Sequence, residues 1–433
     1  MKIAVIGSGI AGMAAARFLS GQNQVVLFEA ADRLGGHTAT IDVDDDGVEQ
    51  HIDTGFIVFN DRTYPHLIEL LQQLGVESQP TSMSFSVNDA ASGLEYAGTS
   101  LNTLFAQRSN LVSPRFWRLV RDIVRFNREV ESDLCANPLL ANVPLGEYLQ
   151  EFRYSSEFRD YYLLPMGAAI WSSAFDDMTR FPLHFLVQFF RNHGLLDFHN
   201  RPQWRVIKGG SRQYIAPLTR SFSNDIRLST PVTAIHRNSL PNGRAWVTVA
   251  SSRGLESFDH VILACHSDQA LKLLGDASAA EREILAAIPY SRNEVVLHTD
   301  TGLLPKLRRT WSSWNVSLGH GNHGKPALTY NMNILQALQS RRTWCVTLNQ
   351  SAEIRDEHIK AVFHYDHPLF TLDGIKAQQR WAEISGIRNT WYCGAWWRHG
   401  FHEDGVWSAH RVADQLQRQI NTGAHSAPLA VAS

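Results

Sequence analysis

The segment Met1–Ala30, MKIAVIGSGIAGMAAARFLSGQNQVVLFEA, decides the fold of this chain. Its first part, KIAVIG, is a short apolar run of the kind found in strands that are buried in a parallel sheet. The glycine turn Gly7-Ser8-Gly9-Ile10-Ala11-Gly12 follows, then a helical pattern and a second apolar strand that ends at Glu29. A G-x-G-x-x-G turn in this strand–helix–strand context, with an acid at the end of the second strand, predicts dinucleotide binding.

Each glycine of the turn has an expected task. Gly7 makes the tight turn, Gly9 lets the backbone approach a pyrophosphate, and Gly12 lets the helix pack closely on the strand. The backbone of Ile10 and Ala11 begins the helix, whose free N–H groups and dipole favour phosphate. We expect Glu29 to accept hydrogen bonds from the ribose hydroxyls.

Composition excludes several other classes of protein. The 433 residues carry a net charge of -2 and 19% charged residues, an ordinary globular composition with no sign of nucleic-acid binding. The length suggests about two to three domains. Four cysteines (Cys135, Cys265, Cys345 and Cys393) lie far apart and form no C-x-x-C pair, which fits a reducing cytoplasm. No run of 18 apolar residues predicts a transmembrane helix.

The residues after Glu29 resemble a known family. Here the sequence AADRLGGHTAT is similar to the Glu-Ala and Arg-x-Gly-Gly-Arg segment of the flavin amine oxidase, phytoene desaturase and protoporphyrinogen oxidase superfamily. The matching residues are Glu29, Ala30, Arg33, Gly35, Gly36 and Thr38. His37 stands where the family has Arg, so the contact at that position is a departure. The resemblance implies FAD, held without a covalent bond because the Ser-Gly-Gly-Cys context of covalent members is absent.

A second block near the end of the chain, CGAWWRHGFHEDG (393–405), resembles the terminal flavin block of the same superfamily. Gly394 and Gly405 match its two glycines, whereas Ala395 replaces an Asp. A helix is expected to start near Asp404 and Gly405, so its N-terminus and the backbone of Val406 would meet the flavin. The resemblance also implies that the backbone of Val232 touches the adenine.

His399 and His402 in this block are spaced H-x-x-H, which alone would suggest a metal. Spacing supplies no third ligand, so we expect no metal site and a flavin-facing loop instead. His402 and Glu403 are candidates for handling a proton near the flavin, with structural hydrogen bonding as the alternative. Trp396 either borders the flavin or the substrate, as a candidate catalytic residue, or is an ordinary core tryptophan.

The fold class expected is α/β, with a Rossmann-type FAD-binding domain and a discontinuous α+β substrate domain, as in amine oxidases. The FAD-binding domain would comprise residues 1–85, 200–270 and 380–425, and the substrate domain 86–199 and 271–379. Residues 101–195 predict helices, and residues 290–365 predict an antiparallel sheet. Residues 161–175 predict a buried helix or an apolar substrate wall; Met166, Ile170, Trp171, Trp311 and Trp314 are candidate pocket residues.

The combination of PMGAAIWS, YDHPLF and GFHEDG resembles a bacterial subgroup of NAD/FAD-binding, amine-oxidase-like proteins over nearly the whole chain. Members are linked with methyltransferases that resemble cyclopropane-fatty-acyl synthases, and some desaturate methylated fatty acyl chains. The resemblance implies a flavoenzyme that takes a hydride from a hydrophobic or lipid substrate and passes electrons to oxygen or a quinone. It also implies a cytoplasmic protein with peripheral contact to the inner face of the membrane.

Two other functions stay open. An amine oxidase often uses a lysine near the flavin; Lys325 is the candidate, with a solvated surface lysine as the favoured alternative. A non-catalytic FAD-binding partner of a lipid-modifying system would bind flavin that no substrate reduces. The sequence leaves the oligomeric state undetermined.

Overall fold

The N-terminal fingerprint lies at the centre of a parallel sheet. In the computed structural model, which describes residues 1–197, 199, 201–243, 245–318 and 327–422, the strand order is β10-β2-β1-β14-β20. The side chains of residues 3–6 and 25–28 are all buried, as continuous apolar runs in a parallel sheet require. The bounds of these strands are Lys2–Ile6 (β1), Gln24–Phe28 (β2), Ile226–Arg227 (β10), His260–Leu263 (β14) and Thr390–Tyr392 (β20).

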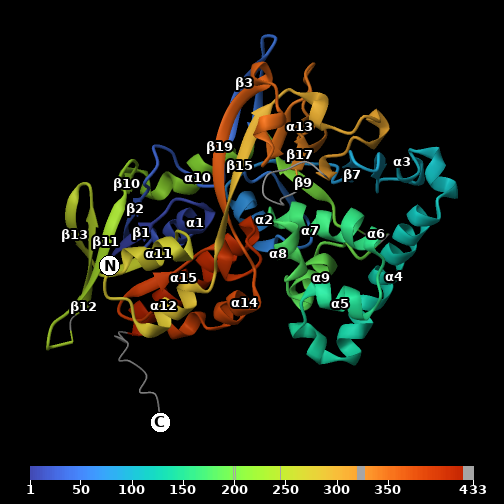
Figure 1. Cartoon of the computed structure of the whole chain (residues 1–433). Coiled ribbons are helices and arrows are strands. Elements are labelled where there is room, and N and C mark those ends of the chain that lie inside the picture. Colours follow the sequence, from blue (N-terminus) through green and yellow to red (C-terminus); the bar gives the residue numbers. More distant parts are fainter. Residues whose placement is uncertain (198, 200, 244, 319–326, 423–433) are drawn as a thin grey trace.

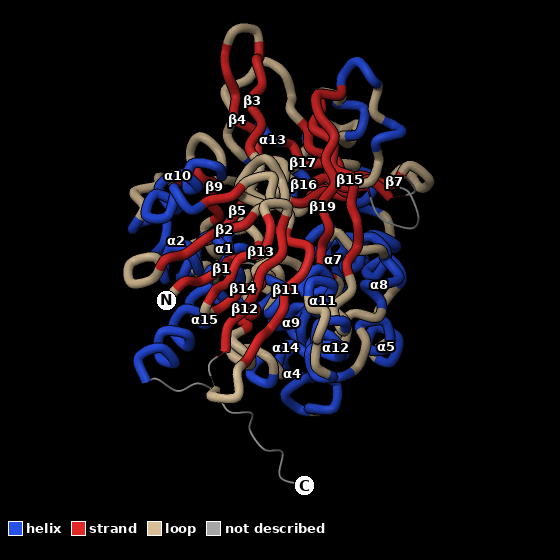
Figure 2. The backbone as a smooth tube through the Cα atoms, turned by 90° about the vertical axis from the view of Figure 1, so that its left-hand side faces the viewer, coloured by secondary structure: helices blue, strands red, loops and turns tan. Residues whose placement is uncertain are grey.

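The described residues also form three smaller sheets. Figure 2 shows the meander β11-β12-β13 (Val232–Ser239, Ala245–Ser251 and Gly254–Phe258), which contacts the parallel sheet through β14 and β1. A second sheet has the order β5-β9-β6 (Val58–Asn60, Trp204–Ile207 and Ser78–Pro80). The hairpin of β3 (Thr40–Asp45) and β4 (Val48–Asp53) projects from the molecule in Figure 1.

A seven-stranded sheet forms the other half of the molecule, in the order β19-β15-β18-β17-β16-β7-β8. Its pairs are antiparallel except β16 and β7, which run parallel. The antiparallel sheet expected from the alternating pattern of residues 290–365 is therefore present, with two earlier strands added at one edge. The strands are Phe85–Asp89 (β7), Leu94–Ala97 (β8), Tyr290–His298 (β15), Trp314–Leu318 (β16), Ala327–Asn331 (β17), Cys345–Leu348 (β18) and Ile359–Pro368 (β19).

Residues 101–195 are largely helical, as expected. The longest helix there, α4 (Pro114–Ala136), has Pro114 in its first turn and is capped by Ser113, whose hydroxyl accepts from the backbone N–H of Phe116. The other helices of this region are α3 (Leu101–Leu104), α5 (Leu145–Glu151), α6 (Ser156–Phe158), α7 (Leu164–Trp171), α8 (Phe175–Thr179) and α9 (Leu183–Asn192), with 3₁₀ turns η1 (Arg108–Val112) and η2 (Pro138–Asn142) and a π-helical turn η3 (Arg159–Leu163).

The helices outside that region surround the parallel sheet or connect the two halves. They are α1 (Ile10–Leu19), α2 (Pro65–Gln73), α10 (Ile215–Thr219), α11 (Ser267–Leu273), α12 (Ala279–Ala286), α13 (Met332–Leu335), α14 (Leu372–Gln379) and α15 (His402–Thr422). α1 and α15 pack together on the parallel sheet, and α2 packs on α15 (Figure 1). No helix in the described ranges has the length and apolarity needed to cross a membrane.

The buried apolar residues form two main cores. One surrounds β1 and α1, and the other lies between the seven-stranded sheet and helices α4–α9. Residues 271–288, expected in the substrate domain, contribute Leu274, Ile284 and Leu285 to the first core. Phe401 packs against both cores, so the loop before α15 lies where the two halves meet.

Candidate functional site

The glycine turn has an open cradle at its centre. A Cβ built on Gly9 would meet no atom within 4 Å, whereas one on Gly12 would lie 2.0 Å from the carbonyl oxygen of Gly7. Gly7 itself has a φ of +105°, a conformation that favours glycine. α1 has no side-chain cap and no acid in its first turn, so its N–H groups are left for an anion. The turn therefore fits the pyrophosphate of a dinucleotide.

Glu29 is fixed beside this cradle. Its carboxylate accepts from the Ser8 backbone N–H at 2.9 Å, the Ser8 hydroxyl at 2.6 Å and the Ala31 N–H at 2.8 Å. The carbonyl of Glu29 accepts from Thr230 N–H, which brings the start of β11 and Val232 to the same edge of the sheet. The orientation of the carboxylate is thus set by the glycine turn itself.

Arg33 organises the loop that follows. Its guanidinium donates to the carbonyl of Gly36 at 3.0 Å and to that of Thr38 at 3.1 Å. Gly35 pairs with Gly9 in an isolated bridge, and a Cβ on Gly36 would lie 3.3 Å from the Gly9 Cα. The double glycine therefore lets the loop pass directly against the cradle, and Arg33 holds the loop there.

His37, which departs from the family pattern, is half-buried between this loop and β19 of the seven-stranded sheet. Its ring centroid lies 5.1 Å from that of Tyr365, 5.3 Å from that of His367 and 6.0 Å from that of His266. Burial lowers the pKa of His37 well below its usual value, and the neighbouring histidines and Arg33 lower it further. The ring is neutral, and its Nε2 atom has no hydrogen-bond partner among the described residues.

His402 is held by stacking and by hydroxyl groups. Its ring stacks on Phe56, with centroids 3.5 Å apart and planes 14° apart. Its Nε2 lies 3.0 Å from Thr38 Oγ1 and 3.3 Å from the Tyr214 hydroxyl, and the two hydroxyls also bond each other. Burial lowers the pKa of His402 to about 3, so the ring is neutral near pH 7. These contacts position His402 beside the predicted cofactor residue Thr38.

Glu403 caps a helix that is distant in sequence. Its two carboxylate oxygens accept from the backbone N–H groups of His66, at 3.2 Å, and Leu67, at 2.9 Å, in the first turn of α2. Burial raises the pKa of Glu403. These bonds fit the alternative that the sequence left open, in which Glu403 makes structural hydrogen bonds instead of transferring a proton.

Asp404 closes the turn that starts α15. It accepts from the N–H of Phe401 at 2.9 Å and lies 3.8 Å from the Arg398 guanidinium, and burial raises its pKa to about 7. α15 begins at His402, two residues before the expected start, because this side-chain bond completes the first turn. A Cβ on Gly405 would lie 2.7 Å from Ile10 Cγ2, so the N-termini of α15 and α1 meet at the cradle. Val406, next to this contact, is fully buried.

The segment before α15 is a buried aromatic turn. Gly394 donates its N–H to Ser408 Oγ at 3.0 Å, and the carbonyl of Ala395 accepts from the N–H of Gly400 at 3.1 Å. Trp396 donates its indole N–H to the carbonyl of Cys265 at 3.1 Å and packs on Trp397. The structure therefore ties Trp396 to the loop after β14, in the core around β1.

His399 faces a wall of phenylalanines. Its ring lies 4.5 Å from Phe185 and 5.9 Å from Phe189, and Phe185 stacks on Phe370 at 5.0 Å. Trp171, at the end of α7, continues the wall through its contact with Phe189 at 4.8 Å. Burial lowers the pKa of His399 to about 3, and its Nε2 has no partner in the described part of the chain.

The other candidate pocket residues lie in different places. Met166 and Ile170 pack from α7 against the second core. Trp314 belongs to β16 and packs edge-on against Tyr330. Trp311 donates to the carbonyl of Pro305, away from the phenylalanine wall. Lys325, the candidate lysine of an amine oxidase, lies outside the described residues.

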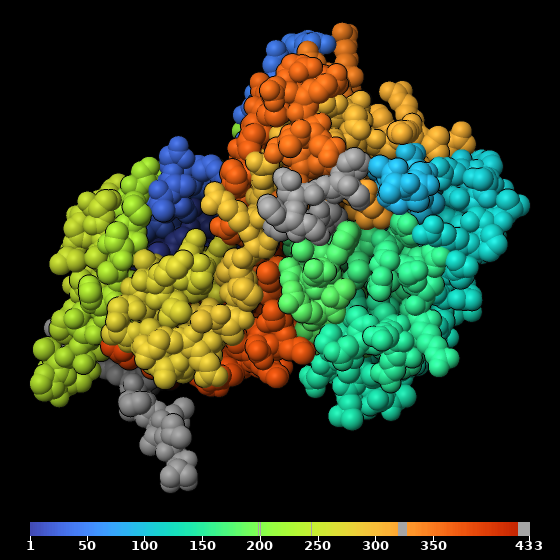
Figure 3. Space-filling model, viewed as in Figure 1, coloured from blue at the N-terminus to red at the C-terminus, as the bar shows by residue number. Residues whose placement is uncertain are grey.

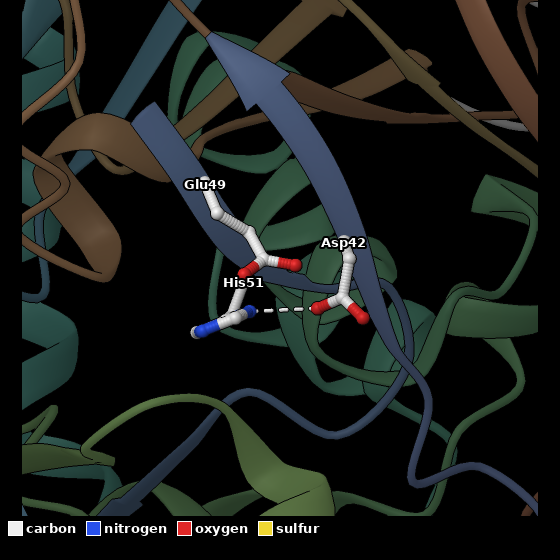
Figure 4. A group of neighbouring side chains, drawn as sticks. All are labelled: Asp42, Glu49 and His51. Carbon is white, nitrogen blue, oxygen red and sulfur yellow. Dashed lines mark hydrogen bonds and ion pairs between the residues drawn. The ribbon is translucent and has the colours of Figure 1, made fainter. Parts of the chain in front are cut away.

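One group of possible metal ligands is present in the described ranges, and it lies apart from the H-x-x-H pair. Figure 4 shows Asp42, Glu49 and His51 on the β3–β4 hairpin. Asp42 already accepts from Arg212 through both oxygens, at 2.6 Å each, and from His51 at 2.6 Å. The guanidinium neutralises the carboxylate that a cation would need. His399 and His402 belong to no such group.

Several neighbours of the site were not among the site residues expected from the sequence. Phe56, Tyr214, His266 and the β19 residues Tyr365 and His367 come from four separate segments and share no motif with the glycine turn. Two of these segments resemble the superfamily or its subgroup: HIDTGF (51–56), with Asp53 and Gly55, and YDHPLF (365–370). A Cβ on Gly55 would lie 2.0 Å from the carbonyl oxygen of His37, so the HIDTGF block packs directly against this position.

The model of the flavin-containing amine oxidoreductase family matches residues 10–329 of this chain. The chain belongs to the flavin-containing amine oxidoreductase family. Membership assigns FAD to the cradle, which the open face of Gly9, the fixed carboxylate of Glu29 and the meeting helix N-termini fit. Gly7 to Gly12, Glu29 and the loop 33–38 would hold its adenosine and pyrophosphate, and residues 394–406 its flavin end.

A named relative is similar to this chain in sequence, and solved structures share its fold. The Mycobacterium tuberculosis protein that carries the name flavin-containing monoamine oxidase AofH is 26% identical to this chain over 335 residues. The match covers 73% of this chain and 66% of AofH, which is just under two thirds of the length of AofH. Cyclohexylamine oxidase from Brevibacterium oxydans has a TM-score of 0.67 at 17% identity, covering 97% of this chain and 99% of that chain. A fatty acid isomerase from P. acnes that produces CLA has a TM-score of 0.64 at 15% identity, covering 96% and 98%.

Proposed function

We propose that this chain is an FAD-dependent oxidoreductase that takes a hydride from a hydrophobic organic substrate, a lipid acyl chain. The observation that carries the proposal is the aromatic wall of Phe185, Phe189 and Phe370 around the loop before α15. Both carboxylates of that loop are engaged elsewhere, Glu403 on α2 and Asp404 on its own turn. Within the described residues, the wall therefore offers hydrocarbon contacts, and neither carboxylate of this loop is left to pair with an ammonium group.

The finer reaction is desaturation of a methylated fatty acyl chain. A hydride leaves one carbon, a proton leaves its neighbour for a base, and a double bond forms between the two carbons; the neutral ring of His402 is the candidate base. The two electrons pass on to oxygen or a quinone. Bound FAD would supply the two-electron acceptor. The chain's own contribution is to hold the acyl chain in a dry aromatic site, where the neutral rings of His399 and His402 add no charge that must be solvated. The catalytic roles of His402 and Trp396 stay predictions. That of Glu403 is also untested, and its bonds to α2 favour the structural alternative.

Two similarities support a lipid substrate. Three segments resemble a subgroup that includes fatty-acyl desaturases: PMGAAIWS, YDHPLF and GFHEDG. The same fold carries a fatty acid isomerase, so it can accommodate an acyl chain.

Amine oxidation is the second candidate. It is favoured by the names of AofH and of cyclohexylamine oxidase, which share the family or the fold. A flavin-binding partner without catalysis is the third, and it predicts bound FAD that neither lipids nor amines reduce.

The test is an anaerobic visible spectrum of the holoprotein before and after addition of methylated phospholipid in detergent micelles. Bleaching of the flavin bands by the methylated lipid, and not by its unmethylated analogue, supports desaturation. Bleaching by amines alone, with hydrogen peroxide released in air, replaces it with amine oxidation. If neither the lipids nor the amines bleach the flavin bands, the result supports the third candidate, a non-catalytic FAD-binding partner.

A further inference from the structure

Exposed apolar side chains gather at one corner of the molecule, far from the cofactor cradle. Leu101, Leu111, Val112 and Trp117 are 76%, 49%, 84% and 48% exposed. Four of the eleven large hydrophobic residues that are exposed in the described ranges thus fall within 17 residues of α3, η1 and the start of α4. Figure 3 shows this cyan segment at the end of the molecule opposite the meander. Such concentration, unlike scattered exposed leucines, marks an interaction surface.

The side chains of the corner are held in place from below. Ser100 caps α3 in a reciprocal capping box with Thr103. Trp117 donates its indole N–H to the carbonyl of Leu111 at 2.9 Å, and its ring lies 5.4 Å from that of the buried Phe105. The corner is therefore a structured part of the fold that presents apolar groups outward.

The same corner is strongly basic. Residues 96–121 contain no Asp or Glu and four arginines, Arg108, Arg115, Arg118 and Arg121. The neighbouring segment 303–318, which contacts α3 through η7 (Arg308–Thr310), contains no acid and adds Lys306, Arg308 and Arg309.

Carboxylates offset part of this charge. Glu157 pairs with Arg118 at 2.6 Å and Arg115 at 3.4 Å, and Asp122 pairs with Arg121 at 3.1 Å. Glu95 is buried and accepts from the backbone N–H groups of Lys306 and Leu307. Seven basic groups against these three acids leave an excess of positive charge around the apolar side chains.

A cavity opens behind this surface. It has a volume of about 270 Å³, and its lining includes Gln107, Ser113, Arg115, Phe116 and Tyr161. Tyr161 also lines a second cavity, of about 510 Å³. The lining of this cavity is mixed: Leu164, Phe175 and Leu318 are apolar, and Asp89, Arg159, Asp160 and Asp176 are charged. The Tyr161 hydroxyl accepts from Arg115 at 3.1 Å, so one side chain of the basic corner is tied to the wall that both cavities share.

The second cavity lies beside the start of α7, the helix whose other end contacts the aromatic wall. Leu164, in its lining, is the first residue of α7, and Trp171 at the other end of α7 contacts Phe189. Eight helical residues span about 11 Å. The preceding π-helical turn, which holds Tyr161, is a feature that often occurs at functional sites.

We propose that the basic corner, defined as residues 101–121 with 306–309, docks the protein on an anionic lipid bilayer. Leucine, valine and tryptophan enter the interface, while the arginines and the lysine meet the headgroup phosphates. An exposed tryptophan ring beside arginines suits the boundary between acyl chains and headgroups. The corner and its cavity would present an acyl chain to the aromatic wall. This inference rests on the proposed lipid oxidation and names the membrane as the source of its substrate.

The experiment measures binding without turnover. The holoprotein is floated with vesicles of phosphatidylcholine alone or with 30 mol% phosphatidylglycerol added, at low and at high salt. We expect at least tenfold tighter binding to the anionic vesicles at low salt and loss of most of that difference at high salt. Leu111→Ser with Val112→Ser, and separately Lys306→Gln with Arg309→Gln, should each weaken binding about tenfold.

Leu139→Ser is the matched control, because Leu139 is 78% exposed but lies beyond the other end of α4. It should bind like the wild type, and unchanged flavin spectra show that all variants are folded. Equal binding by the control and the corner variants, no vesicle binding, or self-association through the corner would overturn the proposal. If vesicles bind but methylated lipid leaves the flavin oxidised, the docking stands and lipid oxidation fails. If micellar lipid bleaches the flavin but the protein does not bind vesicles, lipid oxidation stands and the docking proposal fails.

Discussion

At the scale of single residues, the cradle depends on which glycines face protein and which face open space. Gly12 is packed against the Gly7 carbonyl and the Ala264 methyl, whereas the Cα of Gly9 faces an empty region. The sequence motif alone could assign these tasks, since a tight turn and a helix fix them locally. It could not show that His37 lies among three other rings, because those rings come from β19 and from the loop after β14.

The first prediction separates these two glycines. Gly9→Val should leave the apoprotein folded, because its Cβ meets nothing and Gly9 has an ordinary φ of -62°. It should weaken FAD binding at least about tenfold, or 1.4 kcal/mol, by filling the place of the pyrophosphate. Gly12→Ala should instead destabilise the fold. Fluorescence titration with FAD and urea unfolding of the apoproteins measure the two effects; equal loss of stability in both variants would contradict the assignment.

The second prediction concerns His298 in β15. It bonds Thr347 Oγ1 at 2.7 Å, and burial lowers its pKa from 6.5 to about 4. Because the folded pKa is depressed, the unfolded chain binds the proton first. The contribution of the neutral His298 side chain to the free energy of unfolding is complete above pH 6.5 and is lost as the pH falls toward 4. Between pH 8 and pH 5 the residue should account for about 2 kcal/mol of lost stability. Urea unfolding of wild type and His298→Gln at both pH values tests this; parallel losses would refute it.

At the scale of elements, the local sequence pattern predicted individual helices and strands correctly. Contacts between elements that are distant in the sequence could not be predicted in this way. The first strand–helix–strand unit and α4 follow from periodicity and end signals within a few dozen residues. Glu403 was singled out as a proton-handling candidate, yet its carboxylate caps α2, 336 residues earlier. No spacing rule connects an acid at the start of one helix to the free N–H groups of another.

The third prediction distinguishes a cap from an acid–base group. Glu403→Gln should lower the stability of the protein by about 1–2 kcal/mol, because α2 loses its charged acceptor. The rate of flavin reduction per folded, FAD-bound molecule should be unchanged. Thermal unfolding and anaerobic stopped-flow reduction measure the two quantities. A large fall in the rate with no loss of stability would restore the proton-transfer role.

At the scale of the whole molecule, the cofactor site joins distant parts of the chain. Residues 7–38, the start of β11 and residues 394–406 converge on one edge of the parallel sheet. Bound FAD should therefore stabilise the entire fold rather than one segment.

The fourth prediction follows from this convergence. At an FAD concentration about 100 times the Kd, the holoprotein should be about 2.7 kcal/mol more stable than the apoprotein. Thermal unfolding with and without FAD measures the difference. Gly9→Val is the control, since its unfolding should not respond to the same concentration of FAD. An equal response in the variant would place the cofactor elsewhere.

The order of strands in the two large sheets also governs how the protein can be made. The parallel sheet needs β20 at residues 390–392, and the seven-stranded sheet pairs β7 at 85–89 with β16 at 314–318. During synthesis, β1 and β2 leave the ribosome long before β20, and β7 waits more than two hundred residues for its neighbour β16. Early edges are thus left without partners while translation continues, and such edges invite wrong pairing. Chaperones that shield nascent strands should matter more for this fold than for one built from consecutive hairpins.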